Sequence, residues 1–279
     1  MTVVDWLLEP LSFGFIVRGL IAAVLVGIVC PVIGTYVVLR GMAFFGDALA
    51  HTILPGVVVA FLLGWPLALG ALAMGILTAL GIGALSSQGL VKEDTAIGVI
   101  FAGSFALGVA MLSTTGNYTI DLAHFLFGNL LGVSAADLWV IAGLGTIVLG
   151  TIFLFYKEFL VLSFDPTLAV TLRLPTIFLR YLLLTLIAVT VVVALEVVGI
   201  ALVVAMLVTP AAAASLLTRR LLPMMLIAAV IGTIAAITGL YASFYLNVAS
   251  GPAVVLLATL VFVITFLFSP ERGVIWSKT

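Results

Sequence analysis

Two ionisable residues, Asp47 and His51, lie four positions apart in an otherwise largely apolar stretch of the sequence. In an α-helix this spacing puts both side chains on one face, about 6 Å apart. A carboxylate and an imidazole together are a suitable ligand set for a divalent transition metal ion. If the stretch crosses a membrane, two such groups are costly there and usually mark an ion path. The pair therefore predicts a metal-binding position on a transport route.

A purely structural alternative remains open, in which the same two side chains form a hydrogen bond that ties two helices together. As a metal site the pair is incomplete, because divalent metals usually take four to six ligands. A two-fold dimer with both copies of this helix at its axis would supply two carboxylates and two imidazoles. The ligand count thus favours a second copy of the chain as a partner.

The composition indicates that membrane helices hold this pair. The chain has 279 residues, of which 65% are hydrophobic and 8% charged, and its mean hydropathy is +1.47. Continuous apolar runs of about 20 residues are typical of transmembrane helices. They predict an all-α, polytopic membrane protein, with a single transmembrane domain over residues 1–279 in a lipid bilayer. About nine spans are expected, near 14–36, 41–64, 66–86, 95–113, 137–156, 176–196, 197–217, 223–246 and 252–268.

The basic residues predict an orientation. If the loop at 157–175 is cytoplasmic, alternation puts nine of the ten basic residues at cytoplasmic ends, and only Arg18 falls near the outer face. These nine are Arg40, Lys92, Lys157, Arg173, Arg180, Arg219, Arg220, Arg272 and Lys278. The N-terminus is then outside and the C-terminus inside. Because the net charge is −1 and no basic cluster exists, nucleic acid is not an expected partner.

Depth and helix shape around the pair can also be predicted. If the second span begins near Gly41, Asp47 lies roughly 9 Å and His51 roughly 15 Å into the membrane, at 1.5 Å per residue. Pro55 follows four residues after His51 and removes a backbone hydrogen bond, so we expect a kink beside the pair.

Small residues recur at every fourth position in two of the expected spans. Such stripes let helix backbones approach closely in membranes, so both predict helix packing. One stripe comprises Ala71, Gly75, Ala79 and Gly83, and the other comprises Gly98, Ala102, Ala106 and Ala110.

The cytoplasmic connection predicts a short helix. Asp165 is a good N-cap, and Pro166 suits the first helical position. Leu168 and Leu172, with Ala169 and Leu174, would give this helix an apolar face. A lone capped helix with such a face needs something to dock against, which can be a partner, its own chain or the lipid surface.

Other polar residues are weaker candidates. Glu196 lies near the outer end of a span and is a possible entrance residue, although an interfacial carboxylate is the simpler interpretation. Asp121 and His124 lie on the longest outer connection, from Ser113 to Ala136. Its apolar part is too short to span, so it reads as a re-entrant or interfacial helix in which a capping role outweighs a ligand role.

The sequence contains no phosphate-binding loop for ATP, because that pattern needs a glycine directly before a lysine and none precedes Lys92, Lys157 or Lys278. An ATP-driven energy source is therefore not expected in this chain. We also find no nucleophile–base set or HExxH motif, so an enzyme is not expected. The chain is either a passive or ion-coupled carrier, or the membrane subunit of a pump whose ATPase is a separate chain.

Four sequence blocks resemble a known family. VVLRGMAFFGDALAHTILPG (37–56) resembles the hallmark of the ABC-3 family, the permease subunits of bacterial manganese, zinc and iron importers. LFGNLLGVSAADL (126–138), SFDPTLA (163–169) and VVGIALVVAMLVTPAAAASLL (197–217) agree in order. The resemblance covers roughly residues 14–268.

This resemblance implies a homodimeric permease in a bacterial cell membrane, with cytoplasmic ATPase subunits and an extracytoplasmic metal-binding protein as partners. It implies that Asp47 and His51 coordinate the metal, and that Asp165, Pro166, Leu168 and Leu172 belong to a helix that couples to the ATPase. The cargo would be Mn²⁺, with Zn²⁺ or Fe²⁺ as alternatives, and no resident cofactor is expected.

Two rival functions stay open. In an ion-coupled secondary carrier the Asp47–His51 pair would be a proton relay, although such carriers usually distribute charges over several spans. A permease for a metal chelate would need a wide polar or aromatic cavity in place of a ligand pair.

Overall fold

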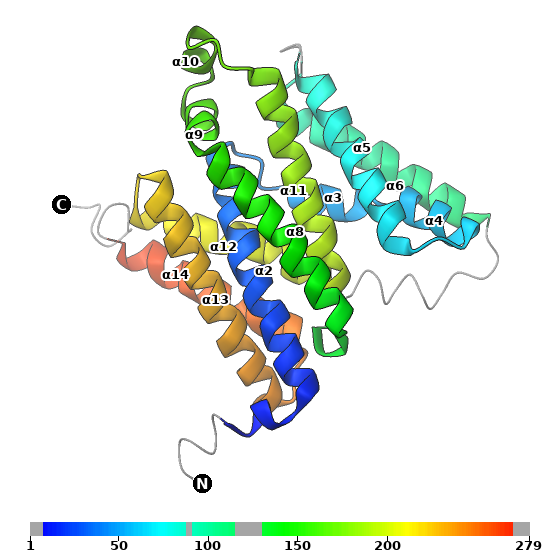
Figure 1. Cartoon of the computed structure of the whole chain (residues 1–279), viewed down its shortest axis with the longest axis vertical. Helices are drawn as coiled ribbons and strands as arrows, with labels where there is room; N and C mark the ends of the chain where they lie inside the picture. The colour runs from blue at the N-terminus through cyan, green and yellow to red at the C-terminus, as the bar shows by residue number, and fades with distance from the viewer. Residues whose placement is uncertain (1–7, 88–90, 115–129, 270–279) are drawn as a thin grey trace.

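The computed structural model describes residues 8–87, 91–114 and 130–269, and within them the chain is built of helices with no strand (Figure 1). Nine segments of this described part are long and apolar enough to cross a membrane, as predicted. The helices are α2 (Gly14–Leu39), α3 (Phe45–Thr52), α4 (Leu54–Leu63), α5 (Leu67–Ser87), α6 (Glu93–Ser113), α8 (Ala135–Leu154), α9 (Tyr156–Phe164), α10 (Pro166–Thr171), α11 (Thr176–Val198), α12 (Ile200–Leu217), α13 (Leu221–Leu246) and α14 (Ser250–Phe268), with short 3₁₀ turns η1 (Pro10–Ser12) and η2 (Leu130–Gly132).

The helices form two groups that α11 joins. In one group α2 packs on α12 and α13, and α14 covers those two helices. In the other, α3, α4, α5 and α6 pack on one another. α11 contacts α5 on one side and α2 and α8 on the other, so it lies between the groups (Figure 1).

Glycines allow backbone contact within the first group. A Cβ atom on Gly34 of α2 would lie 1.8 Å from the Leu207 carbonyl oxygen of α12, and one on Gly232 of α13 would lie 2.4 Å from the Gly27 carbonyl oxygen of α2. Only glycine fits at such approaches. These contacts hold α2, α12 and α13 together more closely than side chains would permit.

The two small-residue stripes have different environments. The stripe on α5 is buried, and Cβ atoms added at Gly75 and Gly83 would collide with Val192 and Tyr181 of α11. That stripe packs helices, as predicted. The stripe on α6 (Gly98, Ala102, Ala106 and Ala110) is exposed. Nothing lies within 4 Å of a Cβ atom added at Gly98, so this stripe has no packing partner there.

The second span begins later than predicted. Gly41 has φ +69° and ends α2 in a Schellman motif, in which the Met42 amide donates to the Val37 carbonyl and the Gly41 amide to the Val38 carbonyl. This glycine therefore terminates one helix and does not start the next, which begins at Phe45. The predicted kink is confirmed as a break at Ile53 between α3 and α4, with Pro55 in the first turn of α4.

Two other boundaries refine the prediction. The boundary predicted between the spans 176–196 and 197–217 is a turn at Gly199, whose φ of +79° separates α11 from α12. The 157–176 connection contains a helix that the sequence analysis did not predict, α9, in addition to α10. Phe159 of α9 packs edge-on against Tyr36 of α2, with ring centroids 5.7 Å apart, so α9 is anchored to the first group.

Candidate metal site and its surroundings

Asp47 and His51 lie on the same face of α3, as their spacing predicts. Oδ1 of Asp47 is 3.7 Å from Nε2 of His51, a distance too long for a hydrogen bond. The side chains are 48% and 34% exposed, respectively. Within the described part of the chain neither hydrogen-bonds to another helix. The alternative of a structural hydrogen bond between helices therefore finds no support among the described residues.

Two phenylalanines of α6 border the imidazole of His51. The ring centroids of Phe101 and Phe105 lie 5.8 and 5.7 Å from that of His51, and both contacts are edge-type. The two phenylalanine rings are themselves nearly parallel, 6.0 Å apart. The pair thus has an apolar aromatic wall on one side, which limits the directions from which a polar ligand can reach the imidazole.

The predicted depth of the pair was wrong by about one helical turn of α3. Because α3 begins at Phe45 and not near Gly41, Asp47 is in its first turn and His51 about 6 Å farther along, at 1.5 Å per residue. A carboxylate is favoured at that place by the partial positive charge of the helix N-terminus. In Figure 1, α3 lies part-way along the length of α11 and α5.

A second carboxylate, which the sequence analysis missed, shares a pocket with Asp47. The pocket has a volume of about 230 Å³ and is lined by Phe44, Asp47, Asp94 and Phe101, among others. Asp94 lies in the first turn of α6, an acidic position at the start of a membrane span that could have drawn attention. Across residues 8–87, 91–114 and 130–269 no three His, Cys, Asp or Glu side chains come together as a metal cluster, so this part of one chain offers a partial ligand set.

A group of paired charges lies at the start of α6, beyond Asp94. Oε1 of Glu93 is 2.5 Å from an Nη atom of Arg40, at the end of α2, and 3.6 Å from Nε of Arg180 in α11. The Arg180 guanidinium also donates to the Ser86 carbonyl of α5. In the sequence these arginines counted only toward orientation, because nothing in the spacing shows that three helices converge on Glu93.

The short helix α10 has the predicted cap. The Asp165 carboxylate accepts a hydrogen bond from the Leu168 amide at 2.9 Å, and Pro166 is the first helical residue. The apolar face is divided: Ala169 is buried, whereas Leu168 and Leu172 are 45% and 55% exposed. Leu172 lies at the C-cap, one residue beyond the helix. The two exposed leucines are thus available to something outside this chain.

The remaining candidates are only partly described. Glu196 lies in the last turn of α11, at the opposite end of that helix from α10, and its side chain is outside the described set. Asp121, His124 and most of the expected re-entrant helix also lie outside the described residues.

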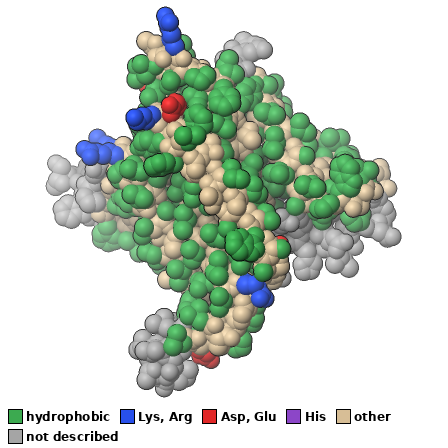
Figure 2. Space-filling model, viewed as in Figure 1, with side chains coloured by type: hydrophobic (Ala, Val, Ile, Leu, Met, Phe, Trp, Pro, Cys, Tyr) green, Lys and Arg blue, Asp and Glu red, His purple; other side chains and the backbone are tan. Residues whose placement is uncertain are grey.

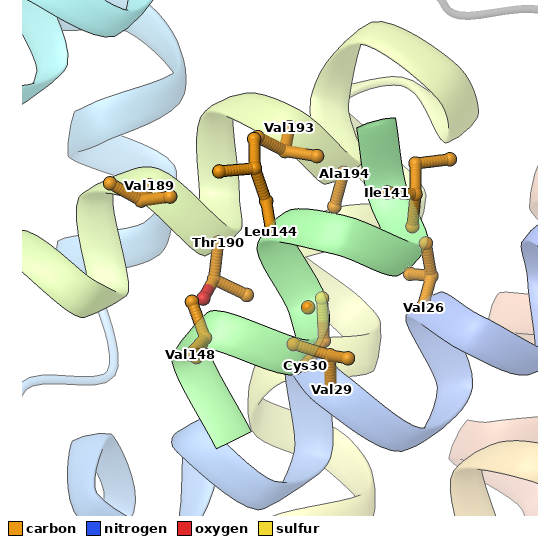
Figure 3. A pocket seen from close by; sticks show the side chains of 11 residues that line it. Val26, Val29, Cys30, Ile141, Leu144, Val148, Val189, Thr190, Val193 and Ala194 are labelled. Carbon is orange, nitrogen blue, oxygen red and sulfur yellow. The ribbon is translucent and has the colours of Figure 1, made fainter. Parts of the chain in front are cut away.

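A small apolar cavity elsewhere in the molecule is not an ion site. It has a volume of about 20 Å³ and lies between α2, α8 and α11, where valine, isoleucine and leucine side chains surround Cys30 (Figure 3). The hydroxyl of Thr190 at its edge already donates to the Leu186 carbonyl. The lining offers no charged ligand, so the cavity is a packing void.

Comparison with known proteins identifies relatives over almost the whole chain. The family model described as the ABC 3 transport family matches residues 12–269. The manganese transport system membrane protein MntC of Halalkalibacterium halodurans is 48% identical over 96% of this chain and 91% of its own length. The chelated iron transport system membrane protein YfeD of Yersinia pestis is 38% identical over 94% of this chain and 88% of its own. The solved structure of PsaBC from Streptococcus pneumoniae in complex with Fab superposes with a TM-score of 0.86 at 36% identity, covering all of both chains.

Proposed function

Since this chain belongs to the ABC 3 transport family, we propose that it is the membrane-spanning permease subunit of an ATP-driven importer for a divalent transition metal ion. Manganese is the favoured cargo, because the relative from Halalkalibacterium halodurans is named for manganese transport. Iron is the second candidate, on the name of the Yersinia pestis relative.

The observation that carries this proposal is the Asp47–His51 pair. The side chains are 3.7 Å apart on one face of α3, are partly exposed, and use none of their ligand capacity on other helices of the described chain. An anionic oxygen and a neutral imidazole nitrogen are the donors that Mn²⁺, Fe²⁺ and Zn²⁺ accept. An ion held here exchanges its water ligands for these side chains, while Phe101 and Phe105 form an apolar wall beside it.

We infer that a second copy completes the ligand set. The exposed small-residue stripe of α6 begins at Gly98 and runs beside Phe101 and Phe105, which contact His51. Small residues at every fourth position permit close contact with a second helix in a membrane. Two copies that meet along this stripe would bring their Asp47–His51 pairs toward one another and provide four ligands.

The remaining partners follow from the two ends of the molecule. On the face in Figure 2, Lys and Arg side chains lie mainly toward the end that carries α10, which supports placing that end, and the C-terminus, in the cytoplasm. α10, with exposed Leu168 and Leu172, is then the docking element for a cytoplasmic ATPase subunit. Glu196, at the opposite end of α11, is an entrance residue for ions delivered by an extracytoplasmic metal-binding protein.

The route of the ion follows from the carboxylates. From Glu196 at the outer end, the ion would reach the Asp47–His51 pair. Asp94, in the same pocket as Asp47 and at the start of α6, provides the next anionic oxygen toward the cytoplasmic end. Glu93 plays no part in this route, because its carboxylate is already paired with the guanidinium groups of Arg40 and Arg180.

The decisive test is the energy source. The chain is purified with its associated subunits, reconstituted into proteoliposomes and assayed for ⁵⁴Mn²⁺ uptake. We expect an ATPase subunit to co-purify, and uptake to stop when that subunit is inactivated by mutation of its nucleotide-binding lysine. Uptake that continues without ATP hydrolysis and follows a proton gradient would establish the secondary carrier instead.

The dimer is tested separately by cysteine cross-linking. Cys30 is fully buried and can remain in place. We expect Ala106→Cys, on the exposed stripe of α6, to form a disulfide-linked dimer in membranes. Leu260→Cys, at an exposed position of α14, is the matched control and should remain monomeric. The reverse pattern would place the interface on α14 and remove the basis for a four-ligand site on α3.

A further inference from the structure

A polar pocket lies beside the start of α10. Its volume is about 440 Å³, and its lining comes from α9, α10, α11 and the ends of α2, α5 and α6. Four charged side chains contribute to it: Arg40, Lys92 and Arg180 are cationic, and Glu93 is anionic. The pocket therefore carries an excess of positive charge, and we call it the Arg40 pocket.

The carboxylate of Glu93 does not satisfy Arg40 completely. Glu93 Oε1 contacts one Nη atom of Arg40 and also Nε of Arg180, so a single anion is shared between two guanidinium groups. The other Nη atom of Arg40 is buried and has no hydrogen-bond partner in the described part of the chain. A guanidinium has five N–H donors in a planar fork, and here a part of that fork is unused.

Burial makes this deficit significant. The Arg40 side chain is only 9% exposed. Burial lowers the pKa of the Arg40 guanidinium from its ordinary value and neighbouring Arg180 lowers it further, whereas Glu93 acts in the opposite direction. A buried cation with an unpaired donor is costly unless an anion reaches it. Oγ of Ser163, which lines the same pocket, is also buried without a hydrogen-bond partner, so two unsatisfied polar atoms come from different helices.

We propose that the Arg40 pocket receives a carboxylate side chain, Asp or Glu, from the cytoplasmic ATPase subunit. Because both atoms are buried, the Arg40 and Ser163 side chains would turn toward the pocket on docking. The carboxylate would then accept hydrogen bonds from the free Nη atom of Arg40 and from the Ser163 hydroxyl. The inference rests on the proposed function, because it assigns a contact to that ATPase.

The position of the pocket indicates the source of the carboxylate. Pro166, the first residue of α10, forms part of the lining, and Leu168 and Leu172 are exposed on the same short segment. α10, the start of α11 and the end of α5 lie at one end of the molecule (Figure 1). A partner that covers the exposed leucines of α10 therefore also covers the pocket. The contact would join the ATPase to Glu93 and Arg40, and so to α6 and to the end of α2 that precedes α3.

Two variants of one residue test the proposal. Ser163→Asp supplies a carboxylate from the permease itself and fills the pocket, whereas Ser163→Asn has nearly the same size without the charge. Each variant, in lipid nanodiscs without anionic lipid, is titrated with the ATPase subunit that co-purifies with the wild-type chain. We expect Ser163→Asp to weaken binding about tenfold or more, and Ser163→Asn to change it less than threefold. Equal affinities for the two variants, or tighter binding by Ser163→Asp, would overturn the proposal.

A second measurement does not depend on how these variants fold. A photo-cross-linking amino acid at Val91, which lines the pocket and is only partly buried, is activated in the assembled complex, and the attached peptide is identified by mass spectrometry. We expect a peptide of the ATPase subunit with an Asp or Glu next to the attachment point. Attachment to anionic lipid, or to this chain alone in a complex that retains its ATPase, would overturn the assignment. If no ATPase binds the wild-type chain at all, the proposed function itself fails.

Discussion

Two carboxylates in the first turns of neighbouring helices, Glu93 of α6 and Asp47 of α3, differ in how many partners they have within the chain. Glu93 contacts two arginines from two other helices and is 19% exposed. Among the described residues Asp47 forms an ion pair only with His51, at 3.7 Å, and is 48% exposed. A carboxylate that is paired within the chain holds helices together, whereas one that lacks partners is available to a ligand. Changes at the Asp47–His51 pair should therefore affect transport, and changes at Glu93 should affect stability.

The largest effect is expected at Asp47 and His51, which make no hydrogen bond to another helix of the described chain. Asp47→Ala or His51→Ala should reduce metal uptake at least a hundredfold. Each change removes two of four ligands in a symmetric dimer, and about 1.5–3 kcal/mol per charged contact gives about 3–6 kcal/mol. Uptake is measured per assembled complex in proteoliposomes, with thermal stability as the control. Near-normal uptake per complex in either variant would end the coordination hypothesis, and loss of assembly would favour the structural tie.

The next effect tests the paired group. Glu93→Gln removes the shared anion of Arg40 and Arg180. It should destabilise the folded chain by about 3 kcal/mol, the low end of the range for breaking a buried pair, because Glu93 is partly exposed. Asp94→Asn, at the exposed adjacent position, is the matched control and should change stability by less than about 0.5 kcal/mol. Denaturation in detergent measures both, and equal stabilities would mean that the Glu93 contacts contribute no net stability.

A smaller effect is expected at α10, whose leucines Leu168 and Leu172 are left exposed by the described part of the chain. Leu168→Glu should weaken binding of the ATPase subunit about tenfold, because it places a charge on the apolar surface that docks. Thr167→Glu, at the polar neighbouring position, should bind normally. ATPase stimulation and co-purification report the difference, and normal coupling in Leu168→Glu would refute docking through this face.

The smallest effect is expected at Asp165, whose carboxylate already accepts a hydrogen bond within its own chain. Asp165→Ala removes the N-cap of α10 and should cost about 1 kcal/mol of local helix stability. Amide hydrogen exchange in residues 167–171 should become about fivefold faster, since 1.4 kcal/mol corresponds to a factor of ten. Asp165→Asn retains an oxygen acceptor and should exchange like the wild type, and equal acceleration in both variants would exclude the cap as the cause.

Sequence patterns predicted the features that depend on neighbouring residues in the chain. Nine spans, the break near Pro55, the Asp165 cap and the shared face of Asp47 and His51 all follow from periodicity or local spacing. The start of the second span was misplaced, because Gly41 supports a helix end as well as a helix start, and only its φ of +69° decides between them.

Features that depend on how distant helices meet could not be predicted. Arg40, Glu93 and Arg180 come from three helices, and no spacing in the sequence brings them together. The two small-residue stripes look alike in the sequence, yet α11 covers the one on α5 and leaves the one on α6 exposed. The sequence identifies such groups by residue type, and the tertiary arrangement decides which of them are satisfied.

The burial of Cys30 gives this protein a built-in reporter of unfolding. It is the only cysteine in the chain, and it lies fully buried beside the cavity between α2, α8 and α11 (Figure 3). A thiol-reactive fluorophore can reach it only after these three helices separate. The rate of labelling of the wild-type chain therefore measures the opening of that part of the bundle directly, without an introduced label.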